Sequence, residues 1–421
     1  MPNFRIKLSI FLNYFLFAIL LNSVGTVILQ VQRYFGAAES SASILEACKD
    51  ISIAAVSFIV ASFITRIGYK KSMLIALGLM TVACFIMPFV KTFLAIKILF
   101  AVTGACFGLT KVSVLGTIGL ITKDEKEHIS IMNFIESFFM VGILTGYFIF
   151  SSYIDDNDAG SDKWFQVYYI MGGLSAAAFL LLSSSPLDES AAKMEHTLTA
   201  KESFSGMLTL IVVPVVISFI VCAFVYVLIE QSIMSWLPTF NNKVLKLPST
   251  ISIQMTSILA ASTAAGRFLA GIVMKKFNWL SVLICCLAAT AALVLIVLPL
   301  VGTQEHAITG WADVPVAAYV FPLIGFFLAP IYPAINSVIL SSLPKSKHGV
   351  MSGLIVVFSA LGGTLGSIST GFIFQEYGGQ AAFYFSLVPM AILVTALIVF
   401  KRIRNKAVAQ EVAVNSVDVH L

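Results

Sequence analysis

Long apolar runs alternate with short polar segments along the whole chain. Each run is close to the ~20 apolar residues that a helix needs to cross the hydrocarbon core of a bilayer. We therefore predict that each run forms one membrane-spanning helix. Twelve runs can be distinguished, and they cover roughly residues 9–31, 45–65, 72–91, 94–121, 128–152, 164–184, 208–236, 250–274, 279–301, 315–342, 348–374 and 381–401.

The composition excludes a soluble globular protein. Of the 421 residues, 59% are hydrophobic and only 11% are charged, whereas about 25% of a soluble domain is charged. The first apolar run is too long for a cleavable signal peptide and lacks a small-residue cleavage site, so it is predicted to span the membrane. We expect an all-α integral membrane protein.

The distribution of basic residues predicts how the helices are oriented. With both termini placed in the cytoplasm, the inner segments hold 17 Lys and Arg, the outer segments hold seven, and two lie inside helices. Cytoplasmic loops carry such an excess of basic residues in membrane proteins. Both termini are therefore expected in the cytoplasm, and the acidic stretch 155–162 is expected outside.

The chain repeats itself. At an offset of 220 residues, the stretch 127–146 matches 347–366, and at an offset of 210 the basic segment 61–71 matches 271–277. Internal repeats of this kind are typical of transporters. The longest polar segment separates the two halves. We predict four parts: an N-terminal six-helix bundle (1–184), a cytoplasmic linker (185–207), a C-terminal six-helix bundle (208–404) and a cytoplasmic tail (405–421).

Twelve helices in two similar halves, with a basic loop after the second helix of each half, resemble the major facilitator superfamily. The signature loop of that family reads Gly-x-x-x-Asp-Arg-x-Gly-x-basic. This chain keeps the spacing but has Ala61 and Thr65 in place of the Gly and the Asp. The resemblance implies that the loops latch the two halves together, and the gating residues that it suggests are Arg66, Gly68, Lys70 and Lys275.

Four stretches resemble one branch of that superfamily, the fucose–proton symporter-like branch, and within it the TsgA-like members. They are "YVLIEQSIMSWL" (226–237), "GRF" (266–268), "GFFLAPIYPAINSVIL" (325–340) and "NFIESFFMVG" (133–142). The resemblance implies a single-chain transporter, working as a monomer, in a bacterial inner membrane.

Two departures separate the chain from the sugar carriers of this branch. Those carriers have an Asp after an Asn in the first helix and a Glu in the fourth. Here Asn22 is followed by Ser23, and the Glu position holds Thr110 with Lys111 beside it. The architecture is therefore expected to carry over, whereas sugar specificity and the usual proton site do not follow from it.

Two opposite charges fall inside predicted helices at similar depth. Lys111 lies about 15 Å and Glu136 about 12 Å from the inner ends of their helices, at 1.5 Å per residue. A charge inside a bilayer is expensive and usually functional. We predict an ion pair in the central cavity, in which a substrate that displaces Lys111 lets Glu136 bind a proton. The alternative is a structural pair in which each charge neutralises the other.

Other polar groups within the apolar runs are also candidates. Glu230 is a second intramembrane acid, either a coupling or substrate-binding group or a solvated acid near a helix end. Arg267 suits an ion pair or an anionic substrate. Pro330 and Pro333 predict a kinked helix, because proline frees backbone carbonyls. The candidate substrate-binding residues are Asn22, Lys111, Asn133, Glu136, Glu230, Gln231, Arg267, Tyr332 and Asn336, and the candidate proton-coupling residues are Glu136, Lys111 and Glu230.

The function expected from these features is secondary active transport of a small polar solute, a sugar or a sugar-like molecule, coupled to protons. The alternatives are transport of an organic anion or zwitterion, drug-type export, or a non-transporting membrane sensor. No phosphate-binding loop is present, which excludes ATP drive, and no nucleophile–base arrangement suggests an enzyme. The six cysteines lack metal-ligand spacing. The expected partners are the solute, protons and the lipid bilayer, with no cofactor, metal or nucleic acid.

Overall fold

The computed structural model describes residues 4–61, 64–122, 125–190, 200–274, 276–300, 308, 310–342 and 348–418, and for some residues in these ranges only the backbone. Helices dominate the described part, which contains no strand. The predicted all-α class is therefore confirmed.

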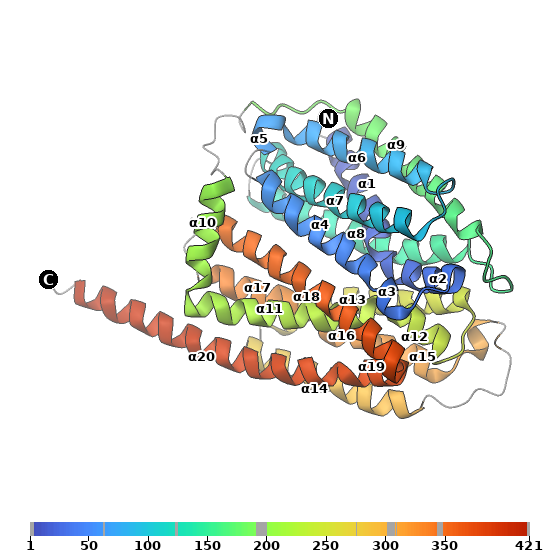
Figure 1. Cartoon of the computed structure of the whole chain (residues 1–421). Coiled ribbons are helices and arrows are strands. Elements are labelled where there is room, and N and C mark those ends of the chain that lie inside the picture. The colour runs from blue at the N-terminus through green and yellow to red at the C-terminus, as the bar shows by residue number, and fades with distance from the viewer. Residues whose placement is uncertain are drawn as a thin grey trace.

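The helices that precede residue 184 are called the N-terminal helices, and in Figure 1 they form the upper layer. They are α1 (Phe4–Asn22), α2 (Val24–Phe35), α3 (Glu39–Ala42), α4 (Ile44–Ala61), α5 (Ile64–Ile67), α6 (Tyr69–Ile86), α7 (Phe93–Ile121), α8 (Glu125–Ser151), the short 3-10 helix η1 (Lys163–Gln166) and α9 (Val167–Ser183).

The helices from Pro214 onward are called the C-terminal helices, and they form the lower layer of Figure 1. Between the layers, at one side, lies α10 (Ala200–Ile211). The C-terminal helices are α11 (Pro214–Met234), α12 (Leu237–Lys243), α13 (Ser249–Val273), α14 (Trp279–Val297), η3 (Leu298–Leu300), η4 (Trp311–Asp313), α15 (Val316–Val320), η5 (Phe321–Leu323), α16 (Ile324–Leu328), α17 (Ile331–Ser341), α18 (His348–Tyr377), α19 (Gly379–Phe385) and α20 (Leu387–Asp418).

Ten helical stretches in the described part are long and apolar enough to cross a membrane. The two remaining predicted runs, 45–65 and 250–274, correspond to the long helices α4 and α13, which are not among the ten. Three charged residues lie in α4, and α13 contains seven serines and threonines. The structure thus supports ten of the twelve predicted spans by length and hydropathy, and the chain is an integral membrane protein.

Several of the predicted spans are interrupted, three of them beside candidate site residues. The first is interrupted at Ser23, between α1 and α2, and another at residues 235–236, between α11 and α12. The third ends as α16 at Leu328 and resumes as α17 at Ile331, beside the two prolines. The kink predicted from Pro330 and Pro333 is confirmed. Broken helices of this kind leave backbone groups exposed at a cavity or a helix contact inside the membrane.

Glycines allow the closest helix contacts. A Cβ atom on Gly142 would lie 2.7 Å from the Phe15 carbonyl oxygen of α1, and one on Gly366 would overlap the Leu228 carbonyl of α11. A small residue every fourth position lets two membrane helices approach so closely. Gly142 and Gly366 each belong to a pair of glycines four residues apart, in "GILTG" (142–146) and "GGTLG" (362–366), so these spacings serve helix packing.

The two ends of the molecule are named after their loops. The Gly36 end holds residues 36–43, where Gly36 has φ 62° and ends α2, and the Gly68 end holds the turn before α6, where Gly68 has φ 96°. Only glycine adopts such angles without strain.

The N-terminal and C-terminal helices are bonded to each other at the Gly36 end. This is where the hydrogen bonds and ion pairs between the two groups gather in the described part of the chain. They join Lys243 to Glu39 (2.6 Å), Ser235 to Glu46 (2.6 Å), Ser40 to Gln375 (2.7 Å), Thr250 to Asp156 (3.1 Å), Gln254 to Ser151 (3.2 Å) and Gln32 to Thr239 (3.5 Å).

The acidic stretch at this end is held locally. The Lys163 ammonium donates a hydrogen bond to the Asp155 carboxylate at 2.9 Å. This bond lowers the pKa of Asp155, so the carboxyl is charged near neutral pH. Arg33 also donates to the Asp155 carbonyl at 3.3 Å, which ties the loop to α2.

Candidate substrate and coupling site

A polar cluster lies within the C-terminal helices. The Tyr226 hydroxyl on α11 donates to the Glu230 carboxylate at 2.8 Å, and the Tyr226 ring stacks on Tyr332 of α17 with centroids 5.6 Å apart. The Tyr332 and Ser359 hydroxyls are 2.9 Å apart, which adds α18 to the cluster. Three helices that are distant in sequence therefore bring their polar groups to one place.

Two buried polar atoms at this cluster have no hydrogen-bond partner, Arg267 Nε on α13 and Asn336 Oδ1 on α17. The guanidinium of Arg267 acts electrostatically on Glu230, and Asn336 lies close to the Tyr332 hydroxyl. Buried polar groups in proteins are nearly always bonded, so unbonded ones call for an explanation such as a ligand or water. A donor and an acceptor are thus available to a bound molecule.

Four predicted residues, Glu230, Arg267, Tyr332 and Asn336, meet in this cluster. Sequence reasoning missed Tyr226 and Ser359. Tyr226 could have been found, because it precedes Glu230 by four residues and therefore lies on the same face of the helix.

The ion pair predicted between Lys111 and Glu136 is not formed. Both side chains are described, and no salt bridge of 4.0 Å or less joins them. The Lys111 ammonium instead lies 6.0 Å from the centroid of the Phe107 ring, and Glu136 is exposed. The charge of Glu136 still acts on Lys111 and on Tyr14. Counting helical rise gave similar depths for the two residues, but it does not give the separation of the two helices.

Three aromatic rings lie beside these charges. Tyr14 of α1, Phe107 of α7 and Phe139 of α8 form a triangle with centroid distances of 6.2, 6.1 and 6.2 Å. Each ring comes from a different N-terminal helix. The triangle places three aromatic rings, two of them buried, next to one basic and one acidic group of the N-terminal helices.

The other predicted binding residues lie elsewhere or are not described. Asn22 donates to the Ala18 carbonyl of its own helix at 2.9 Å, beside the break at Ser23. Gln231 accepts a hydrogen bond from Ser235 at 3.3 Å, towards the Gly36 end. The side chain of Asn133 lies outside the described residues.

An ionic cluster that sequence reasoning missed occupies α4. The Lys49 ammonium pairs with the Glu46 carboxylate and lies 3.4 Å from Asp50. The three residues are 5%, 0% and 7% exposed, respectively. The signal was present in "EACKD" (46–50), which places three charged residues on one helical face at the start of a predicted span.

Two of the predicted gating residues, Gly68 and Lys70, lie at the Gly68 end. The backbone N–H of Lys70 donates to Glu189 at 2.6 Å, and its ammonium donates to the carbonyls of Ser183 and Ser185 at 3.0 and 2.6 Å. The start of the expected linker is thus bonded to this loop. The Arg66 side chain and Lys275 lie outside the described residues.

Replacing Glu189 with Ala is expected to speed hydrogen exchange at the Lys70 amide, because the amide loses its acceptor. Exchange of the peptide that covers residues 68–71, followed by mass spectrometry, measures this. The matched control is Asp188→Ala, because Asp188 accepts from Ser190 at 3.0 Å and not from this loop. Equal exchange in both variants would show that Glu189 does not hold the loop.

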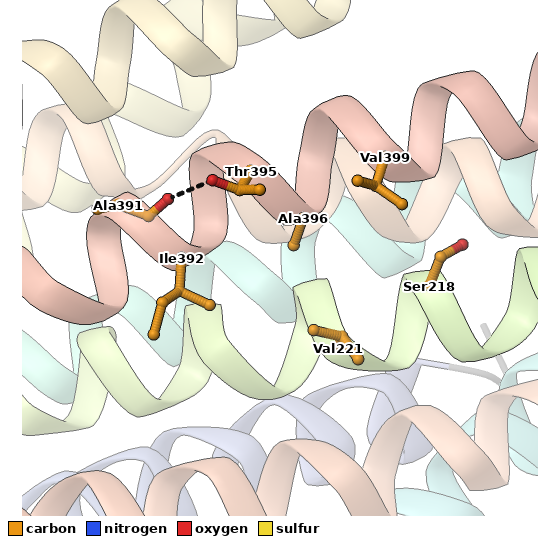
Figure 2. A pocket seen from close by; sticks show the side chains of 7 residues that line it. All are labelled: Ser218, Val221, Ala391, Ile392, Thr395, Ala396 and Val399. Atoms are coloured by element: carbon orange, nitrogen blue, oxygen red, sulfur yellow. Dashed lines mark hydrogen bonds between the residues drawn. The ribbon is translucent and has the colours of Figure 1, made fainter.

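A groove of 480 Å³ between α11 and α20 lies away from the polar cluster. Figure 2 shows its seven lining residues, which are mostly aliphatic. The Thr395 hydroxyl donates to the Ala391 carbonyl at 3.0 Å and the Ser218 hydroxyl to Val215 at 2.9 Å, so both are bonded within their own helices. The groove offers little to a polar solute. Within the described residues, no group of three potential ligands could hold a metal ion.

The sequence model of the Major Facilitator Superfamily matches residues 10–367 and 307–416. The TsgA homolog of Buchnera aphidicola subsp. Baizongia pistaciae (strain Bp) is 23% identical over 394 residues, which cover 93% of this chain and 94% of that protein.

Two solved structures share the fold. A D-xylose–proton symporter superposes with a TM-score of 0.74 at 14% identity, covering 95% of this chain and 97% of that one. The E. coli fucose:proton symporter superposes with a TM-score of 0.61 at 15% identity, covering 96% and 99%. The similarity to a TsgA homolog and to a fucose symporter agrees with the branch that the sequence motifs resemble.

Proposed function

Because the chain belongs to the Major Facilitator Superfamily of membrane transporters, we propose that it moves a sugar or sugar-like solute by alternating access, with protons as the coupling ion. It is a transporter and not an enzyme. The named substrates of the structural neighbours, xylose and fucose with protons, support this substrate class and this coupling ion.

The observation that carries the substrate site is the pair of unbonded atoms beside Tyr226 and Glu230. Arg267 Nε offers a donor and Asn336 Oδ1 an acceptor, and the stacked Tyr226–Tyr332 pair offers an aromatic face. A sugar presents hydroxyl groups that both donate and accept, together with an apolar ring face. Such a site matches a polar solute better than a drug-like apolar one.

Alternating access requires the two halves to move as bodies. We propose that bundles 1–184 and 208–404 separate at the Gly36 end in the other state. The bonds that now join Glu39 to Lys243 and Ser40 to Gln375 would break. The basic residues predicted at the Gly68 end would place that end in the cytoplasm of a bacterial inner membrane, with the monomer as the working unit.

We propose Glu136 as one proton-coupling residue, with Lys111 as the group that responds to the substrate. Replacing Glu136 with Gln is expected to abolish the pH dependence of transport while the protein stays folded, because the amide cannot bind a proton. Uptake into proteoliposomes across an imposed pH gradient measures this. Glu376→Gln, an exposed residue outside the site, is the matched control, and unchanged coupling in Glu136→Gln would reject the assignment.

A second candidate substrate is an organic anion or zwitterion. The unbonded Arg267 Nε and the Lys111 ammonium, which forms no ion pair among the described residues, favour it. Either positive group would attract a carboxylate, and Arg suits one especially because its fork matches carboxylate geometry.

A thermal-shift panel on the purified protein separates the two candidates. A ligand that binds only the folded state raises the melting temperature by mass action. Stabilisation by hexoses or deoxyhexoses that is lost in Glu230→Gln and kept in Glu376→Gln would support the sugar. Stabilisation by anions alone, lost in Lys111→Ala, would support the second candidate.

A further inference from the structure

The ionic cluster of α4 lies outside the polar cluster described above, at the place where the two groups of helices meet. Lys49 pairs with Glu46 and lies 3.4 Å from Asp50. Helix α4 packs against α7 on one side and against α18, a C-terminal helix, on the other. The cluster therefore sits at a contact between the parts that transport would separate.

The cluster is not electrically balanced. It holds two carboxylates and one ammonium, so it carries a net negative charge when all three groups are ionised. An ion in a buried place is costly unless opposite charges and hydrogen bonds compensate it.

Among the described residues of the neighbouring helices, no second cation pairs with Glu46 or Asp50, and the charge of Lys97 on α7 acts instead on Cys48. Helix α7 presents the backbone at Gly104, and α18 presents Gly363. Helix α8 contributes the neutral Tyr147, which interacts electrostatically with Glu46. Helix α11 contributes a further acid, Glu230, which interacts electrostatically with Lys49. The excess negative charge thus stays with the cluster.

The two acids of the cluster differ in their partners. Glu46 accepts from Lys49 with one oxygen and from the Ser235 hydroxyl, at 2.6 Å, with the other. Among the described residues, the polar partner of Asp50 is Lys49 alone, through the longer contact to its Oδ1. Its Oδ2 faces Gly363, whose Cβ position would be 2.5 Å away. Asp50 is therefore the less satisfied carboxylate.

Ser235 connects this cluster to the contact between the bundles. It lies at the break between α11 and α12, and its carbonyl oxygen is 2.8 Å from the Cβ position of Gly25 on α2. The bond from Ser235 to Glu46 crosses from the C-terminal to the N-terminal helices. Separation at the Gly36 end would break this bond and let water reach all three charged groups.

We propose that the cluster of Glu46, Lys49 and Asp50 is a proton-binding site, and that Asp50 takes up one proton when the Gly36 end closes. In the open state water solvates the net negative charge. Closure removes that water, and one proton on Asp50 leaves the Lys49–Glu46 pair neutral within the contact. This inference rests on the proposed alternating access and adds a proton site on α4 to the one proposed at Glu136.

The test measures closure directly and needs no substrate. Ser40 and Gln375 touch across the Gly36 end, with oxygens 2.7 Å apart, so a short bifunctional thiol reagent should bridge cysteines at both positions only when this end is closed. The rate of this cross-linking is followed by mass spectrometry between pH 5 and about 9, a range wide enough to show a one-proton linkage. The same cysteine pair is placed in the protein with Asp50 and in the Asp50→Asn protein, and the ratio of the two rates at each pH cancels the ionisation of the thiols.

The rate of the protein with Asp50 divided by the rate of the Asp50→Asn protein is expected to fall as the pH rises. The fall is at most about tenfold per pH unit, the limit for one linked proton. The Glu46→Gln variant also removes the excess charge, so its rate should lose the proton-linked pH dependence as that of Asp50→Asn does. If Asp50→Asn does not fold, Glu46→Gln takes its place as the reference. The matched control is Glu39→Gln, which breaks an ion pair at the same end. It should slow closure at every pH and keep the slope. A ratio that is constant with pH would overturn the proposal.

Proton-coupled transport and the proton site on α4 can be rejected independently of each other. Substrate uptake that ignores the pH gradient would reject proton coupling of transport, even if cross-linking depends on Asp50. Uptake that follows the gradient together with a constant ratio would keep proton-coupled transport and reject the α4 site.

Discussion

Replacing Lys49 with Met is expected to lower the free energy of unfolding by about 3–5 kcal/mol, the range seen when one partner of a buried ion pair is removed. The variant leaves Glu46 and Asp50, which are 0% and 7% exposed, without a cation. Methionine keeps much of the volume of the lysine stem, so the loss reports charge more than packing. Unfolding of the detergent-solubilised protein, followed by circular dichroism, measures the change.

Two comparisons show whether charge is the cause. Lys97→Met removes a lysine that lies 4.3 Å from the Phe93 ring centroid and has no described ion pair, and it should change the stability by less than about 1 kcal/mol. Adding Glu46→Gln and Asp50→Asn to Lys49→Met should restore most of the loss, because no uncompensated charge remains. If Lys49→Met were as mild as Lys97→Met, water would already solvate the cluster.

The Gly104→Ala variant is expected to lose about 1–3 kcal/mol of stability, the usual cost of overpacking a well-packed contact. A Cβ at this position would overlap the Lys49 carbonyl oxygen of α4 and lie 3.1 Å from the Ser52 Cβ. Backbone atoms cannot move aside as a flexible side chain can, so α7 and α4 would have to separate. Thermal unfolding in detergent measures the loss.

The same helix supplies a control. Gly119 also lies in α7, and a Cβ there meets nothing within 4 Å. Gly119→Ala should be neutral or stabilising, since Ala exceeds Gly in helix propensity by up to about 1 kcal/mol. A similar loss in both variants would mean that glycine flexibility, and not the α4–α7 contact, sets the stability.

The sequence predicted part of the candidate site because some of its signals are local. Tyr332 and Asn336 were found from the two prolines beside them, and Glu230 and Arg267 stood out as ionisable groups within apolar runs. The structure brings these four together. The prediction of a Lys111–Glu136 ion pair was wrong. Depth along a helix can be calculated from residue number, whereas the distance between two helices depends on their packing.

The ionic cluster on α4 was missed for a different reason. Its three charged residues lie at one end of a run whose remaining residues are apolar, so the average over the run concealed them. Spacing alone places Glu46, Lys49 and Asp50 on one helical face, but it does not say whether that face meets water, lipid or another helix.

The sequence by itself determined that this protein is helical and that it resides in a membrane, since run length and hydropathy are properties of consecutive residues. The tertiary structure alone decided which charges meet. It separates Lys111 from Glu136, leaves Arg267 Nε without a partner, and brings Ser235 of the C-terminal helices to Glu46 of the N-terminal ones. Contacts between helices depend on their rotation and approach, which glycines such as Gly104 and Gly363 set through backbone proximity.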